Sequence, residues 1–163
     1  MNSSQQKFFK LANHPFKFRM YLLFKLPAAF FSGIKVKEIN EKRCVTSVPY
    51  KWLTQNPFRS TYFACLSMAA EMSTGALAMA HLYKLNPPVS MLVVKVESTY
   101  SKKATGRTYF TCEDGELFSK MIEEAIADGE PKTVIAKSVG KNKDGEVVAE
   151  FFITWSFKAR SKK

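Results

Sequence analysis

One nearly uninterrupted apolar segment, residues 56–82, constrains this chain more than any other feature. It reads NPFRSTYFACLSMAAEMSTGALAMAHL and is long enough for about seven helical turns. Its middle holds one carboxylate, Glu71. Because a helix that is apolar on all sides is normally buried, this carboxylate must be paired, protonated or functional. Glu71 is therefore the first candidate for a functional residue.

The composition indicates one domain with a full core. The chain has 163 residues, of which 46% are hydrophobic and 13% aromatic, and these values argue against disorder. The apolar run at residues 20–34 is interrupted by Lys25 and Pro27 and lacks a cleavage site, so we expect a packed helix there rather than a membrane span or a signal peptide. The three cysteines are widely spaced and odd in number, which predicts a cytoplasmic protein with reduced thiols, no metal site and no cofactor.

The net charge of +11 predicts an affinity for anions, whether nucleic acid, anionic lipid or phosphorylated small molecules. The basic residues are spread along the chain, with local concentrations at residues 7–25 and 158–163. No nucleic-acid motif is present and the aromatic residues alternate as core residues do, so we predict no nucleic-acid binding. Residues 7–26, rich in Phe and Lys, are compatible with membrane-surface contact, but we favour the interpretation that their aromatic side chains cover the sheet.

The order of helical and strand patterns is typical of a sheet wrapped around one helix. Ser60 or Thr61 is expected to cap the long helix, which should end near Leu85, and Asp114 should cap a shorter one. The long helix is rich in small residues that let strands approach closely, so we predict an α+β fold with a six-stranded antiparallel sheet around it. Shorter helices are predicted at residues 4–12, 15–26 and 115–128, and strands at residues 33–39, 43–50, 89–100, 106–113, 132–141 and 146–158.

This order and two local motifs resemble the hotdog-fold thioesterase superfamily. The motifs are NPFRS at residues 56–60 and MAAEMSTG at residues 68–75. The likeness is to a thioesterase-like branch with no assigned function, similar to the phenylacetic-acid-degradation-type acyl-CoA thioesterases. It implies a hotdog domain at residues 33–158, preceded by an N-terminal helical extension at residues 1–32 and followed by a basic tail at residues 159–163.

The resemblance also implies a site. In acyl-CoA thioesterases of this superfamily an Asn opens the loop before the central helix, a His-Gly pair stands at the helix start, and an acid follows about two turns later. Asn56 matches the Asn and Glu71 the acid, whereas Tyr62 and Phe63 replace the His-Gly pair. A Ser or Thr from the neighbouring subunit often places the water, and Ser90 is the nearest match.

The chemistry of such a site follows from the helix itself. Unpaired backbone N–H groups at a helix N-terminus can stabilise an oxyanion, and a carboxyl among apolar residues has a raised pKa that suits a general base. Tyr62 and Glu71 are nine residues apart, hence on opposite helix faces, so they share one site only if Tyr62 precedes the first regular turn. Substrate contacts are expected from Arg59, Ala64, Ser67, Met68, Thr74, Gly75 and Arg107.

We therefore predict a thioesterase-like enzyme that hydrolyses an acyl-CoA or acyl-carrier thioester, with Glu71 as general base or nucleophile. Phosphate groups of such substrates can be met by lysines near strand ends, Lys102 and Lys103 among them. The alternative is a non-catalytic acyl- or lipid-binding protein, because Tyr62-Phe63 replaces the expected pair. The resemblance further implies a homodimer or a tetramer with the site between subunits, and an exposed sheet edge favours such pairing.

Overall fold

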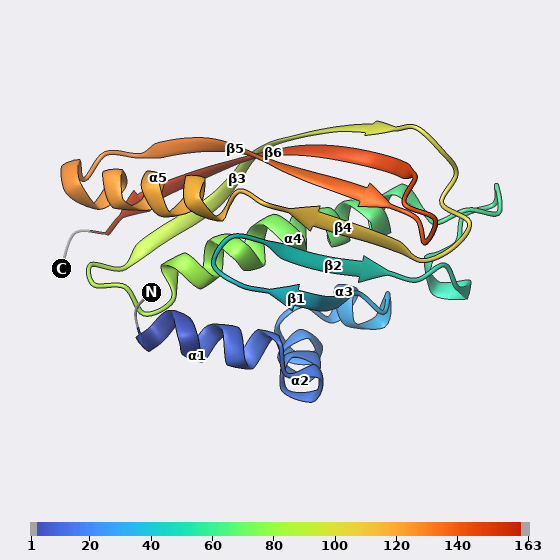
Figure 1. Ribbon diagram of the computed structural model, residues 1–163, viewed down its shortest axis with the longest axis horizontal. Coiled ribbons are helices and arrows are strands. Elements are labelled where there is room, and N and C mark those ends of the chain that lie inside the picture. The colour runs from blue at the N-terminus through green and yellow to red at the C-terminus, as the bar shows by residue number, and fades with distance from the viewer. Residues whose placement is uncertain (1–2, 161–163) are drawn as a thin grey trace.

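Six antiparallel strands form one sheet in the computed structural model, which describes residues 3–160 (Figure 1). The spatial order is β1-β2-β4-β5-β6-β3, so β1 and β3 are the edges of the sheet. The predicted hotdog architecture is confirmed, and residues 161–163 of the predicted basic tail lie outside the described residues. The strands are β1 (Lys35–Ile39), β2 (Cys44–Val48), β3 (Val89–Tyr100), β4 (Thr108–Cys112), β5 (Lys132–Lys141) and β6 (Val147–Ala159).

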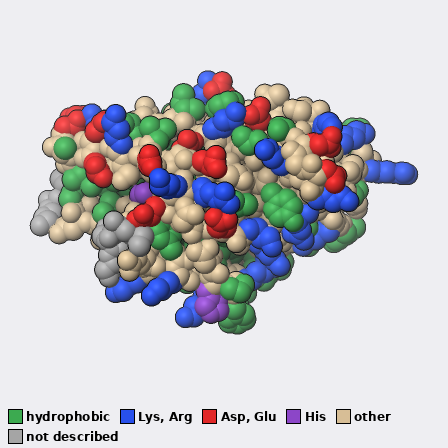
Figure 2. Space-filling model, viewed as in Figure 1, with side chains coloured by type: hydrophobic (Ala, Val, Ile, Leu, Met, Phe, Trp, Pro, Cys, Tyr) green, Lys and Arg blue, Asp and Glu red, His purple; other side chains and the backbone are tan. Residues whose placement is uncertain are grey.

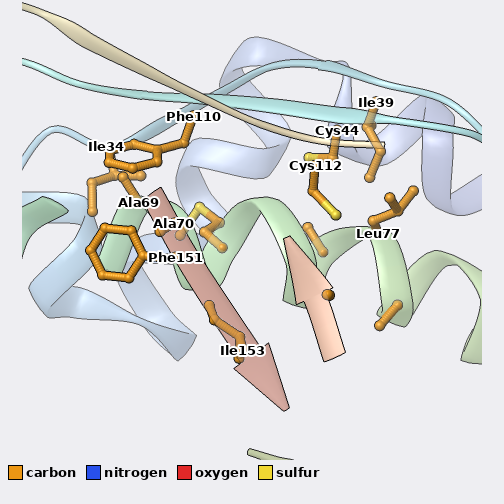
Figure 3. Close-up of a cluster of buried hydrophobic side chains, with 14 of the residues drawn as sticks. Ile34, Ile39, Cys44, Ala69, Ala70, Leu77, Phe110, Cys112, Phe151 and Ile153 are labelled. Atoms are coloured by element: carbon orange, nitrogen blue, oxygen red, sulfur yellow. The ribbon is translucent and has the colours of Figure 1, made fainter. Parts of the chain in front are cut away.

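The long apolar segment forms α4 (Phe63–Leu82), which the sheet covers along its length (Figure 1). Figure 3 shows Ala69 and Ala70 of this helix in the same cluster of buried side chains as Phe151 and Ile153 of β6. By length and composition α4 resembles a membrane span, yet 67% of that stretch is buried inside the protein. It is the core helix of the fold, as the sequence predicts.

The ends of α4 differ from the prediction. The residue before its first turn is Tyr62, and no side chain caps the helix. Ser60 and Thr61 lie in the preceding loop, where the Thr61 hydroxyl donates to the Ala104 carbonyl at 3.0 Å. The helix stops three residues before Leu85, because Tyr83 has an extended ψ of 114°, and Lys84 after it has a positive φ of 54°.

Helix α5 (Gly115–Asp128) packs on the outer side of α4 beside β5 and β6. Its bounds match the prediction, and Gly129 ends it with a left-handed φ of 74°. Asp114 precedes the helix without capping it, because its carboxylate accepts the Lys137 backbone N–H at 2.7 Å. A Cβ on Gly115 would lie 2.0 Å from the Glu41 carbonyl oxygen, so the start of α5 needs glycine.

The N-terminal extension contains α1 (Ser3–Ala12), α2 (Pro15–Lys25) and the short helix α3 (Pro27–Phe31), so the helix expected over residues 20–34 is divided at Leu26. These helices lie on one side of the molecule, where α1 contacts β1 and α4, and α3 contacts α4 (Figure 1). The expectation that their aromatic side chains all pack inward to cover the sheet is not met. Phe8 and Phe18 are buried, whereas Phe16, Phe24 and Phe31 are exposed.

The edge strand β3 is only partly covered. Its first half packs against the core through half-buried Val89, Met91 and Val93. In its second half Val96 pairs with a buried residue of β6, which places Val96 on the inner face of the sheet, yet its side chain is exposed. This end of the inner face therefore lacks a covering element among the described residues.

Candidate functional site

A cleft of about 800 Å³ opens at the N-terminus of α4. One wall is the loop before the helix, and the other is the segment that follows β3. The lining is predominantly apolar, and the basic side chains in it stand together on the second wall. The lining residues are Gln55, Asn56, Pro57, Phe58, Ser60, Thr61, Tyr62, Phe63, Leu66, Tyr100, Ser101, Lys102, Lys103 and Ala104.

The loop before α4 is held in shape by Asn56. Its side-chain Oδ1 accepts the backbone N–H groups of Phe58 at 3.0 Å and Ser60 at 3.2 Å, and also the Ser60 hydroxyl at 3.2 Å. The amide Nδ2 of Asn56 makes no hydrogen bond to any residue of the range 3–160. Asn56 therefore fixes the loop with one atom and keeps a donor for a ligand in the cleft.

The uncapped start of α4 provides two further donors. The N–H groups of Cys65 and Leu66 both bond to the Tyr62 carbonyl. The N–H groups of Phe63 and Ala64 have no acceptor within the described chain, and the positive end of the helix dipole lies at the same place. An oxygen that develops negative charge in the cleft would be stabilised there.

Aromatic rings occupy the positions of the His-Gly pair. Tyr62 and Phe63 are exposed, and their rings pack edge to face with centroids 4.9 Å apart. The Phe63 ring also meets Tyr100 of β3 at 6.5 Å. These rings form an apolar wall suited to an alkyl chain.

Glu71 lies in a different place, two turns further along α4. Its side chain is half-buried and borders a small cavity of about 60 Å³ between α4, the N-terminal helices and β3. Phe8, Phe18 and Met91 line this cavity with it. Within residues 3–160 the carboxylate has no hydrogen-bond or salt-bridge partner, and burial raises the pKa of Glu71 above its ordinary value.

Gly75, one turn after Glu71, makes room for the carboxylate. A Cβ at Gly75 would stand 2.9 Å from Glu71 Oε1 and 3.2 Å from the Trp155 ring. The Trp155 indole N–H donates to the Thr74 hydroxyl at 3.0 Å, which fixes the ring beside the carboxylate. The predicted substrate residue Thr74 is thus buried and engaged in the core.

The predicted catalytic residues therefore separate into two groups. Asn56, Tyr62 and Phe63 line the cleft, whereas Glu71 borders the small cavity on the other side of the helix. The half-turn geometry of α4 accounts for this separation. One chain by itself does not bring the carboxylate to the cleft.

The remaining predicted residues are scattered. The Ser90 hydroxyl donates to the Lys158 carbonyl at 3.1 Å, and strand alternation places Ser90 on the face opposite Met91. Arg59 is exposed in the loop with a φ of 57°, and exposed Arg107 reaches the Ser47 hydroxyl at 3.4 Å. Ala64, Ser67 and Met68 are half-buried positions of α4 outside the cleft lining.

The sequence reasoning missed part of both cavities. Tyr100 and Ala104 line the cleft, and Met91 lines the Glu71 cavity. Tyr100 is an aromatic residue at the end of a predicted strand, and this position is the sequence feature that could have indicated its place in the cleft. Lys102 and Lys103, expected near a substrate phosphate, do line the cleft, and Lys102 forms a salt bridge with Glu146. In residues 3–160 no group of three His, Cys, Asp or Glu side chains is placed to hold a metal ion.

Known proteins resemble the chain in family and in fold. A family model described as Domain of unknown function (DUF4442) matches residues 17–157, and no curated protein matches the chain. The solved protein PA5026 of Pseudomonas aeruginosa, described as a "Probable Thioesterase", is 20% identical with a TM-score of 0.75, covering 90% of this chain and 97% of its own. OLEI01261 from Chlorobaculum tepidum is 15% identical with a TM-score of 0.78, covering 98% and 100%. The thioesterase HI1161 from Haemophilus influenzae is 11% identical with a TM-score of 0.63, covering 86% and 88%.

Proposed function

The chain belongs to the family described as Domain of unknown function (DUF4442), and we propose that it hydrolyses acyl thioesters carried by CoA or by an acyl carrier. The observation that carries this proposal is the uncapped start of α4, which opens into a largely apolar cleft. A half-buried, unpartnered carboxylate on the same helix supplies the second requirement. The thioesterase names of two structural neighbours support it.

The proposed reaction uses three groups. The thioester carbonyl oxygen accepts hydrogen bonds from the N–H groups of Phe63 and Ala64. These bonds stabilise the negative charge that develops on the oxygen during the reaction. Glu71 removes a proton from water, and the water oxygen attacks the carbonyl carbon. The carbon–sulfur bond then breaks, the thiolate takes the proton from Glu71 and leaves as a thiol, and the acyl group leaves as a carboxylic acid. The Asn56 Nδ2 group orients the water or the carbonyl.

A second copy of the chain is needed to assemble this site. The Glu71 cavity includes Met91 near the start of β3, whereas the cleft includes Tyr100 at its end. Antiparallel pairing of the free β3 edge with the same edge of another copy places the start of one strand beside the end of the other. That pairing brings Glu71 of one chain towards the cleft of its partner, and covers exposed Val94 and Val96. We therefore propose a homodimer, alone or within a tetramer.

Hydrolysis of a panel of short- to long-chain acyl-CoA thioesters, followed by thiol release, tests the proposal. Glu71→Gln should lower kcat at least about 100-fold, the usual contribution of a general base, with an unchanged circular dichroism spectrum. Glu130→Gln, which alters an exposed carboxylate after α5, is the matched control and should leave kcat unchanged. Full turnover in Glu71→Gln would remove this carboxylate from the mechanism.

Mixing two inactive variants tests whether the site is shared. Asn56→Asp keeps the loop acceptor but loses the Nδ2 donor, so it should inactivate the cleft without unfolding the loop. An equal mixture of refolded Asn56→Asp and Glu71→Gln should recover about a quarter of wild-type activity, because half of the dimers are mixed and each has one intact site. No recovery from stable mixed dimers would place both residues in one chain's site.

The Tyr62–Phe63 ring pair favours a second candidate function. A bulky ring at position 63 narrows the approach to the free N–H groups and suits retention of an acyl chain. The protein would then bind an acyl or lipid ligand without cleaving it. Saturable binding of a fluorescent fatty acid together with no turnover on the thioester panel distinguishes this function from hydrolysis.

A further inference from the structure

Helix α2 carries two apolar stripes, and the fold uses only one of them. Buried Phe18 and Leu22 form the inner stripe. Phe16, Met20 and Phe24 recur every four residues and form a second stripe on the opposite side. The Phe16 side chain is 69% exposed and that of Phe24 is 74% exposed. Packing of the described residues gives no reason for these outward rings.

Two further apolar side chains of the extension are exposed. Leu26 lies between α2 and α3, where its side chain is 45% exposed and also borders the Glu71 cavity. Phe31 at the end of α3 is 57% exposed. We call Phe16, Met20 and Phe24 the outer face of the extension.

The charge around this face has one sign. Residues 1–37 contain no Asp or Glu, so more than half of the net charge of +11 arises from these residues. Figure 2 shows basic and hydrophobic side chains without acidic ones along the lower edge, where α1 and α2 lie. Lys7, Lys10, Lys17 and Lys25 are exposed and form no ion pair with a described residue. The basic residues of this region are Lys7, Lys10, Lys17, Arg19, Lys25, Lys35 and Lys37.

We propose that the outer face of the extension binds the surface of an anionic lipid bilayer. Exposed aromatic rings enter the boundary between head groups and acyl chains, while the surrounding lysines attract anionic head groups. A second copy of the same face is a poor partner, because uncompensated lysines with no carboxylate between them repel each other. The inner side of the same helices lines the Glu71 cavity through Phe8 and Phe18, so docking would hold that cavity next to the bilayer. The proposal stands whether or not the protein hydrolyses thioesters.

Vesicle co-sedimentation of the full chain tests this inference. The wild-type protein should sediment with phosphatidylglycerol–phosphatidylcholine vesicles at low salt, lose affinity as salt rises, and bind pure phosphatidylcholine weakly. Phe16→Ser combined with Phe24→Ser should weaken binding at least about tenfold, since two exposed rings lose their apolar contact with lipid. Ile135→Ser removes a 58% exposed apolar side chain from β5 and is the matched control, which should bind as wild type does.

Lys17→Glu combined with Lys25→Glu tests the charge separately, and it carries the test alone if the serine variant loses its circular dichroism spectrum. This variant should also bind at least about tenfold more weakly. Equal binding to neutral and anionic vesicles, no binding at low salt, or equal loss in the Ile135→Ser control would overturn the proposal. A wild-type oligomer that the serine variant breaks, seen by light scattering, would instead assign the face to contact between copies.

Discussion

Glu71→Gln should change how stability depends on pH. Burial raises the pKa of Glu71 in the folded chain above the ordinary value of 4.5, which the unfolded chain retains. Between these two values the folded state holds a proton that the unfolded state has released. Stability from this group is therefore fully present below pH 4.5 and is lost as pH rises through the folded pKa.

The magnitude follows from one proton. The free energy of unfolding falls by at most about 1.4 kcal/mol per pH unit in that window, because a single group titrates. The glutamine variant does not titrate, so its stability minus that of the wild type should rise with pH above 4.5 and level off above the folded pKa. A buried amide without a partner shifts the whole curve by a constant amount and leaves its slope unchanged.

Urea denaturation followed by circular dichroism between pH 4.5 and pH 8, at one fixed protein concentration, measures this difference. His81, whose pKa burial lowers, is present in both proteins and cancels in the difference. A difference that stays level or falls across the range would refute the view that Glu71 is desolvated and unpartnered.

Three further outcomes are expected. Gly115→Ala should destabilise the fold by at least about 2 kcal/mol in urea denaturation, since the new Cβ meets a backbone carbonyl oxygen at 2.0 Å. Gly106→Ala is the control and should be neutral or stabilising, because the space around Gly106 is open. Thr74→Val should cost about 1–3 kcal/mol in the same assay, because a buried indole N–H loses its acceptor. If the proposed hydrolysis holds, Lys102→Ala combined with Lys103→Ala should raise KM for acyl-CoA several-fold at low salt, because the two lysines contact its phosphate groups. KM for a pantetheine thioester should not change. An equal rise in KM for both substrates would exclude phosphate contact.

The sequence predicts the elements of this fold because their patterns are strong. Side chains that alternate in β6 and the small apolar residues of α4 predict that both elements are buried in the core, as the structure shows. The half-turn offset between Tyr62 and Glu71 also predicts that they face different sides of the helix, as the structure shows.

Other properties depend on contacts that no local pattern contains. The capping choice at α4 was wrong because the Thr61 hydroxyl bonds across the molecule to the Ala104 carbonyl. The exposure of Phe16 and Phe24 was unexpected, because α2 is apolar on two sides and periodicity alone does not tell which side meets the core. Tyr100 lines the cleft because β3 ends beside the loop that precedes α4, a tertiary contact that no local pattern predicts.

If the proposed two-chain site holds, the placement of Asn56 and Glu71 at separate cavities affects kinetics as well as geometry. A catalytic centre built from two chains makes the rate second order in protein once the solution is dilute compared with the dimer dissociation constant. Specific activity would then fall with dilution although every chain stays folded. Cellular abundance would thus regulate turnover more steeply than a one-chain enzyme allows.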